Sequence, residues 1–144
     1  MNEQPRYRRT VVASILGIVF LPPLTYIGAL FATLYQIVLG FIFGIPSLLS
    51  FVPWLKDLLL LWTPNFGGGV ISGAILIFAT QAIFKFANHK TVSLVVASVF
   101  ILSAVAGGIA NVYGELQIPW VTYIAQCLGI VLGLFLPRFI RPHG

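Results

Sequence analysis

Hydrophobic residues fill the chain in long runs that charged side chains interrupt only at intervals. The first charge-free interval covers residues 10–55, and three shorter intervals cover residues 58–84, 91–114 and 116–137. Each holds at least the roughly 20 residues that a helix needs to cross about 30 Å of hydrocarbon. The pattern therefore predicts an all-α integral membrane protein: one domain, built as a bundle of four transmembrane helices.

The basic residues predict how the chain threads through the membrane. Arg6, Arg8 and Arg9 precede the first interval and favour a cytoplasmic N-terminus. Lys85 and Lys90 flank a short loop that belongs on the same side, so an even number of crossings must lie before it. Short loops and the arginine anchor favour the plasma (inner) membrane, with both termini cytoplasmic. The predicted spans are about residues 11–44, 69–86, 91–112 and 119–138.

The polar segment before the first helix has three interpretations. It can anchor an uncleaved first helix, form a secretory signal peptide, or carry a twin-arginine export signal in Arg8 and Arg9. No A-x-A-like cleavage site ends the apolar run, which extends far beyond the core of a signal peptide. We therefore expect an uncleaved anchor.

The first predicted span is longer than a bilayer requires, and it contains Pro22 and Pro23. A helix over residues 10–45 would be about 54 Å long. Each proline lacks a backbone donor and disfavours helix in the preceding residue, so we expect a sharp kink or a break. A break can line a cavity, whereas a kinked, tilted helix only accommodates the excess length. We favour the kinked helix, and whether residues 11–21 span, kink or lie in the membrane plane stays open.

A short interfacial helix is predicted over residues 53–63, between the first two spans. Pro53 suits the first turn of a helix, and Trp54 and Trp62 share one face by helical spacing. The segment is too short to span, and tryptophan prefers the lipid–water boundary. We expect Trp54, Trp62 and Trp120 to be anchors at the outer surface, with a re-entrant loop as the alternative.

The stretch Asn-Phe-Gly-Gly-Gly at residues 65–69 predicts a flexible turn into the second span. A glycine-rich loop can also bind phosphate, but no Lys-Ser or Lys-Thr pair follows these glycines. The sequence therefore does not predict a nucleotide-binding loop.

Composition supports the membrane assignment, and this assignment changes how the positive net charge is interpreted. Hydrophobic residues make up 59% and charged residues 8% of the 144-residue chain, against about 45–50% and about 25% in soluble domains. The formal net charge of +5 would suggest a nucleic-acid partner for a soluble protein. Here the basic residues lie at the edges of apolar intervals, without the interleaved aromatics of a nucleic-acid-binding patch. We expect contact with the lipid bilayer and no nucleic-acid partner.

Small residues recur at four-residue spacing. Such pairs let two helix backbones approach closely within a bilayer. We interpret them chiefly as contacts within the bundle, with an interface to a partner protein as the alternative for at least one pair. The pairs are Gly40/Gly44, Gly69/Gly73, Ala104/Gly108 and Gly129/Gly133.

Amides are the remaining polar groups within the apolar segments. Gln36, Gln81 and Gln126 lie in three of the spans, and Asn111 lies near the outer end of the other. Because a lipid-facing amide is costly, we expect these side chains to face the bundle and to form hydrogen bonds between helices. The alternative is a polar lining for a neutral substrate or a lipid headgroup.

The sequence predicts no catalytic residue, cofactor or metal site. No ionisable side chain other than tyrosine or cysteine lies near the middle of a predicted span, which argues against a proton-coupled carrier. His89 and His143 are far apart and have no cysteine or carboxylate at ligand spacing, while Cys127 is the only cysteine.

The leading functional hypothesis is therefore a non-catalytic accessory or assembly subunit that packs against another membrane protein or against itself. The short loops, the absence of predicted catalytic residues and the glycines at close-packing spacing favour this hypothesis. The alternative is an oligomeric pore or carrier for a small neutral or lipidic molecule. The two adjacent prolines, the glycine-rich turn and the bundle-facing amides favour this alternative, and an enzyme ranks behind both.

Overall fold

The computed structural model describes residues 4–42, 44 and 50–140, and no strand occurs among them. Four helical segments of this described part are long and apolar enough to cross a membrane, which confirms the predicted helical membrane fold. In chain order the elements are α1 (Gln4–Ile37), the π-helix η1 (Val38–Ile42), α3 (Pro53–Asp57), the π-helix η2 (Leu58–Trp62), α4 (Thr63–Ile83), α5 (His89–Val112) and α6 (Trp120–Ile140).

The second long helix begins much earlier than expected. α3, η2 and α4 follow one another without interruption and form one apolar segment, Pro53–Ile83, of 31 residues. The helix predicted over residues 53–63 is therefore the beginning of this segment, and its interfacial position stays a prediction. The predicted turn at residues 65–69 lies inside α4, so that prediction is wrong. In hydrocarbon every backbone N–H and C=O needs a partner within the chain, and this requirement outweighs the low helix propensity of glycine.

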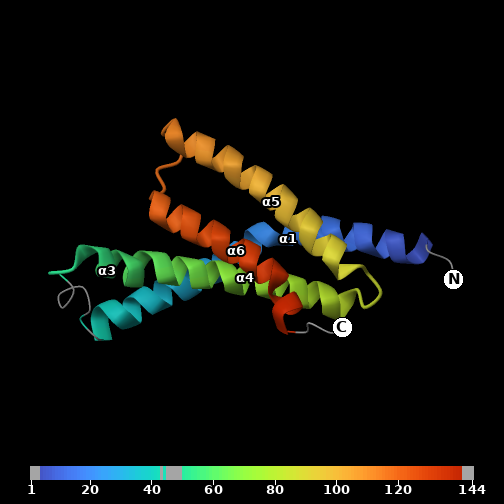
Figure 1. Cartoon of the computed structure of the whole chain (residues 1–144), viewed down its shortest axis with the longest axis horizontal. Helices are drawn as coiled ribbons and strands as arrows, with labels where there is room; N and C mark the ends of the chain where they lie inside the picture. Colours follow the sequence, from blue (N-terminus) through green and yellow to red (C-terminus); the bar gives the residue numbers. More distant parts are fainter. Residues whose placement is uncertain (1–3, 43, 45–49, 141–144) are drawn as a thin grey trace.

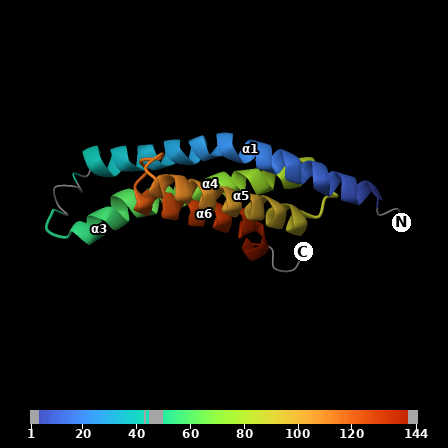
Figure 2. The ribbon, with the colours of Figure 1, turned by 90° about the horizontal axis from the view of Figure 1, so that it is seen from above.

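The first helix passes through Pro22 and Pro23 without a break, so the alternative of a broken helix is wrong. The Thr25 hydroxyl donates a hydrogen bond to the Pro22 carbonyl at 2.5 Å, one of the local contacts by which membrane helices tolerate proline. Figure 2 shows α1 as a gently curved helix along the bundle. A local kink at the prolines stays a prediction.

The bundle has two distinct ends. The start of α1, the connection between α4 and α5, and the last described turn of α6 lie together at one end (Figure 1). We call it the basic end, because Arg6, Arg8, Arg9, Lys85 and Lys90 lie there. At the opposite end, η1 and α3 extend beyond α5 and α6 in both views (Figures 1 and 2). This agrees with helix lengths of about 58 Å for α1 with η1 and about 32 Å for α6.

α4 is the central helix, packed against α6 on one side and α1 on the other. Gly129 of α6 lies against the Phe66 carbonyl, and a Cβ at Gly73 would lie 2.5 Å from the Ile130 carbonyl oxygen. On the other side, Gly28 of α1 meets Gly68, and the Ser72 hydroxyl donates to the Leu24 carbonyl at 2.9 Å. These three helices are close-packed because side chains are missing where their backbones meet.

The limits of α5 follow from its flanking residues. The Asn88 side chain accepts from the Thr91 N–H at 3.4 Å and caps the first turn. At the other end Gly114 has a φ of +79°, its N–H donates to the Asn111 carbonyl at 3.2 Å, and the Glu115 N–H donates to the Ala110 carbonyl at 3.0 Å. This Schellman arrangement ends the helix at the one residue type that adopts such a φ easily.

Candidate functional site

α5 is the least embedded of the four long helices. All of its buried residues, namely Val92, Ser93, Val96 and Ala97, lie in its first half. α5 crosses close to α1 near the basic end and diverges from it toward the other end (Figure 1). The second half of α5 is therefore separated from α1, and a crevice opens between α1, α5 and α6.

Two adjoining cavities, of about 330 and 290 Å³, make up this crevice. They share Thr25 of α1 and Phe100 and Ser103 of α5 and therefore lie side by side. Ser103 lies 14 residues after the start of α5, or about 21 Å along the helix, which puts the crevice within the span of the bundle. The other lining residues are Ile18, Leu21, Pro22, Val96, Val99, Ala104, Gly107, Tyr123, Gln126, Cys127 and Ile130.

Most polar groups of the crevice are engaged by backbone carbonyls. The Ser103 hydroxyl donates to Val99 at 2.9 Å, as Thr25 does to Pro22. The Tyr123 hydroxyl donates to the Ala104 carbonyl and so connects α6 with α5. These oxygens keep free lone pairs, so they can still accept hydrogen bonds from a bound molecule.

Gln126 is the exception. This residue lines the crevice, is half-buried, and its side chain forms no hydrogen bond with any residue that the structure describes. A primary amide offers two donors and one acceptor oxygen. In hydrocarbon, leaving such groups without partners costs about 4 kcal/mol or more. The crevice therefore contains one polar group that needs a partner from outside the described chain.

The other predicted amides have partners of their own or lie elsewhere. The Gln36 amide donates to the Leu60 carbonyl at 2.6 Å and joins α1 to η2. Asn111 donates to the Ile118 carbonyl at 2.9 Å and accepts from its N–H at 3.0 Å, which holds the connection between α5 and α6. Gln81 is half-buried near the end of α4, outside the crevice. The four amides do not form one shared lining.

The four predicted small-residue pairs lie at different places in the bundle. Gly69 and Gly73 lie against Gly129 and Gly133 at the contact of α4 with α6. Ala104 and Gly108 face α6, where a Cβ at Gly108 would meet the Tyr123 and Trp120 rings at 3.8 and 3.9 Å. A Cβ at Gly40 would meet no atom within 4 Å, and Gly44 has a φ of +59° beyond the end of η1.

The three tryptophans have different surroundings. Trp54 is exposed near the start of α3, at the end opposite the basic end. Trp62 stacks on Phe66, with ring centroids 4.7 Å apart. Trp120 lies edge to face with Tyr123, with ring centroids 6.0 Å apart, beside the part of the crevice that Tyr123 lines. Their role as interfacial anchors stays a prediction.

Sequence reasoning missed several residues that position the site. Gly28 and Ala32 of α1, and Gly68 and Ser72 of α4, have the same four-residue spacing as the predicted pairs and are buried. Their four-residue spacing could have identified them from the sequence. No sequence pattern indicated the role of Tyr123, because its contact with Ala104 depends on the crossing of two helices.

The crevice can bind a neutral molecule with an apolar body. Its lining combines apolar side chains with hydroxyl, phenol, thiol and amide groups and contains no carboxylate, lysine or arginine. No group of three His, Cys, Asp or Glu residues suited to a metal occurs in the described part of the chain.

Comparison of the chain with protein-family models, with curated proteins and with solved structures gave no match.

Proposed function

We propose that the protein binds a neutral, lipid-like molecule in the crevice between α1, α5 and α6, as a carrier or a lipid-binding membrane protein. The Gln126 amide carries this proposal. It lies among apolar side chains, is accessible from the crevice, and has no hydrogen-bond partner among the described residues. An ester carbonyl or a hydroxyl of a lipid-like molecule would supply the missing partner, and acyl or ring carbons would fill the space beside Phe100 and Leu21.

The shape of the crevice supports a ligand that enters from the side. It lies between helices and has no charged lining, so an apolar molecule can reach it from the bilayer without crossing a charged barrier. Because the buried residues of α5 all lie in its first half, a movement of its second half breaks chiefly its contacts with Tyr123 and Trp120 of α6. Such a helix suits a crevice that must admit and release a ligand.

Photocrosslinking tests the proposal. The full chain is reconstituted in phosphatidylcholine nanodiscs with a diacylglycerol that carries a diazirine in one acyl chain. We expect adducts concentrated at Phe100, Ser103 and Tyr123, and several-fold fewer adducts in Gln126→Leu. Equal labelling of the exposed α6 residues Leu128 and Leu132, which face outward, would show ordinary lipid contact and contradict the proposal.

Gln36→Leu is the matched control for Gln126→Leu. Gln36 has its own partner in Leu60, so its replacement should lower the free energy of unfolding by about 1 kcal/mol and leave the crosslinks unchanged. Gln126→Leu should not lower the free energy of unfolding, because it removes no hydrogen bond within the described residues and relieves the cost of an unpaired amide. Cys127 supplies a second measurement, since a bound ligand should slow its alkylation by a membrane-permeant maleimide.

The accessory-subunit hypothesis is the second candidate, and the projecting end of the bundle favours it. Phe41 and Phe51 are 87% and 90% exposed there, and Trp54 is 68% exposed. A partner membrane protein that packs on this end would cover three large aromatic rings, the residue type that dominates interfaces. A photoreactive residue at position 41 distinguishes the two: a single protein adduct in native membranes supports a partner, and lipid adducts alone contradict it.

A further inference from the structure

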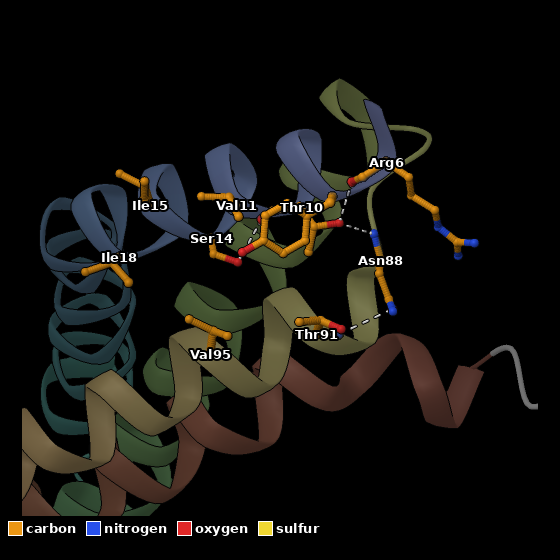
Figure 3. A pocket seen from close by; sticks show the side chains of 10 residues that line it. Arg6, Thr10, Val11, Ser14, Ile15, Ile18, Asn88, Thr91 and Val95 are labelled. Atoms are coloured by element: carbon orange, nitrogen blue, oxygen red, sulfur yellow. Dashed lines mark hydrogen bonds between the residues drawn. The ribbon is translucent and has the colours of Figure 1, made fainter. Parts of the chain in front are cut away.

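A second hollow lies at the basic end, separate from the crevice. It has a volume of about 610 Å³ and lies between the first half of α1 and the start of α5 (Figure 3). One part of its lining is polar and the other is apolar, as a ligand with a polar head and an apolar tail requires. The polar residues are Arg6, Tyr7, Thr10, Ser14, Asn88 and Thr91, and the apolar ones are Val11, Ile15, Ile18 and Val95.

Hydrogen bonds hold the polar wall in place. The buried Thr10 hydroxyl donates to the Arg6 carbonyl and accepts from the Asn88 N–H, both at 2.9 Å. The Ser14 hydroxyl donates to the Thr10 carbonyl at 2.9 Å. Figure 3 shows these groups on the side of α1 that faces α5, with Thr91 across from them. The wall is therefore fixed before any ligand arrives, which lowers the entropic cost of binding.

The charges around the hollow favour an anion. Arg6 lies at its polar end, and its guanidinium extends outward past Asn88 (Figure 3). Arg6 forms no ion pair with any residue that the structure describes, whereas Arg9 lies over the Phe86 ring at 5.1 Å. The acidic residues of the described chain, Asp57 and Glu115, lie at the opposite end of the bundle. A negative headgroup at Arg6 therefore meets no competing carboxylate from the described chain.

The apolar part continues toward the crevice. Ile18 lines both the hollow and the nearer of the two crevice cavities. From Arg6 to Ile18 the wall runs 12 residues along α1, or about 18 Å. An acyl chain can lie along Ile15, Ile18 and Val95 while its headgroup stays at the end of the helices. A free anion would use only the polar end and leave the apolar part unfilled.

We propose that this hollow is a binding site for an anionic phospholipid, with the phosphate beside Arg6 and Thr91 and one acyl chain along α1 and α5. The site is additional to the crevice and does not depend on the ligand proposed there. Basic pockets between helices at a membrane surface are suited to such headgroups, and Tyr7 contributes a ring with a polar end at the same boundary.

Native mass spectrometry of the full chain tests this site. The protein is released from detergent with phosphatidylglycerol or phosphatidylcholine, and the bound lipid is counted at each concentration. We expect phosphatidylglycerol to bind about ten-fold more tightly than phosphatidylcholine, and Arg6→Gln to weaken phosphatidylglycerol about five-fold. Arg8→Gln removes the same charge outside the hollow and should change binding less than two-fold.

A second pair of variants tests the acyl-chain position. Ile15→Trp fills the apolar part of the hollow, whereas Val19→Trp places the same ring on an exposed position of α1 outside it. Only Ile15→Trp should reduce phosphatidylglycerol binding. Equal losses in Arg6→Gln and Arg8→Gln would indicate general surface attraction and overturn the proposal. Displacement of the lipid by millimolar inorganic phosphate would indicate a site for a free anion and overturn it as well.

Failure here is distinguishable from failure of the proposed function. Arg6→Gln and Ile15→Trp should leave the diacylglycerol crosslinks at Ser103 and Tyr123 unchanged. Gln126→Leu should leave the preference for phosphatidylglycerol unchanged. Each site thus has variants that affect it alone.

Discussion

Single glycines decide how closely the helices of this bundle approach. At Gly129 the neighbouring atom is the carbonyl of Phe66 on α4, so even a methyl group has no room. At Gly40 the same added atom would meet nothing within 4 Å. Two glycines that both belong to four-residue pairs in the sequence therefore differ greatly in how much the helix packing depends on them.

We expect Gly129→Ala to destabilise the bundle and Gly40→Ala to leave it nearly unchanged. The added methyl group at Gly129 forces α6 away from α4, and such overpacking costs about 1–3 kcal/mol. Gly40→Ala reduces the freedom of the unfolded chain and should be neutral or stabilising by up to about 1 kcal/mol. Reversible unfolding by sodium dodecyl sulfate, followed by circular dichroism, measures both. Equal losses in the two variants would show that the contact of α4 with α6 is not as close as described.

Helix positions were largely predictable from the charge-free intervals, whereas helix boundaries were not. α5 and α6 lie close to the predicted residues 91–112 and 119–138. The alternative of a break at Pro22-Pro23 and the predicted turn at residues 65–69 failed for one physical reason. Both came from the behaviour of proline and glycine in water, where the backbone can bond to solvent, and hydrocarbon removes that option.

Amide hydrogen exchange tests the helical state of residues 65–69. Because they lie inside α4, their N–H groups should exchange at least about a hundred-fold more slowly than those of residues 116 and 117, which lie between α5 and α6 and donate no hydrogen bond to another described residue. Mass spectrometry of protein in nanodiscs separates the two peptides. Equal, fast exchange would restore the flexible turn that the sequence suggests.

The candidate site was predictable only in part. Gln126 was expected to be a polar lining residue, and it does line the crevice. The crevice itself depends on the divergence of α5 from α1, a crossing angle that hydrophobic spacing does not encode. Thr25 and Ser103 looked like ordinary residues of membrane helices, and only the fold brings them to one space.

The four long helices of the described chain make an even number of crossings between the two ends of the bundle. Four apolar helices connect the basic end to the opposite end and back, so the first and last described turns lie together (Figure 1). Basic residues concentrate at that end, which is the pattern of a cytoplasmic surface. The assignment of that end to the cytoplasm is our prediction.

Cysteine accessibility tests the threading. In a Cys127→Ser background, Phe86→Cys and Glu115→Cys place single thiols in the two connections at opposite ends of the bundle. An impermeant maleimide applied to intact cells should label position 115 and should reach position 86 only after lysis. Labelling of both positions from the same side would contradict an odd number of crossings between them.

The contact between Thr10 and Asn88 has a consequence for biosynthesis. Its two residues are 78 positions apart, and Asn88 precedes the third long helix. The contact therefore cannot form until the ribosome has delivered Asn88, which is more than half of the chain. Until then, this end of the α1 and α4 hairpin lacks its connection to the start of α5.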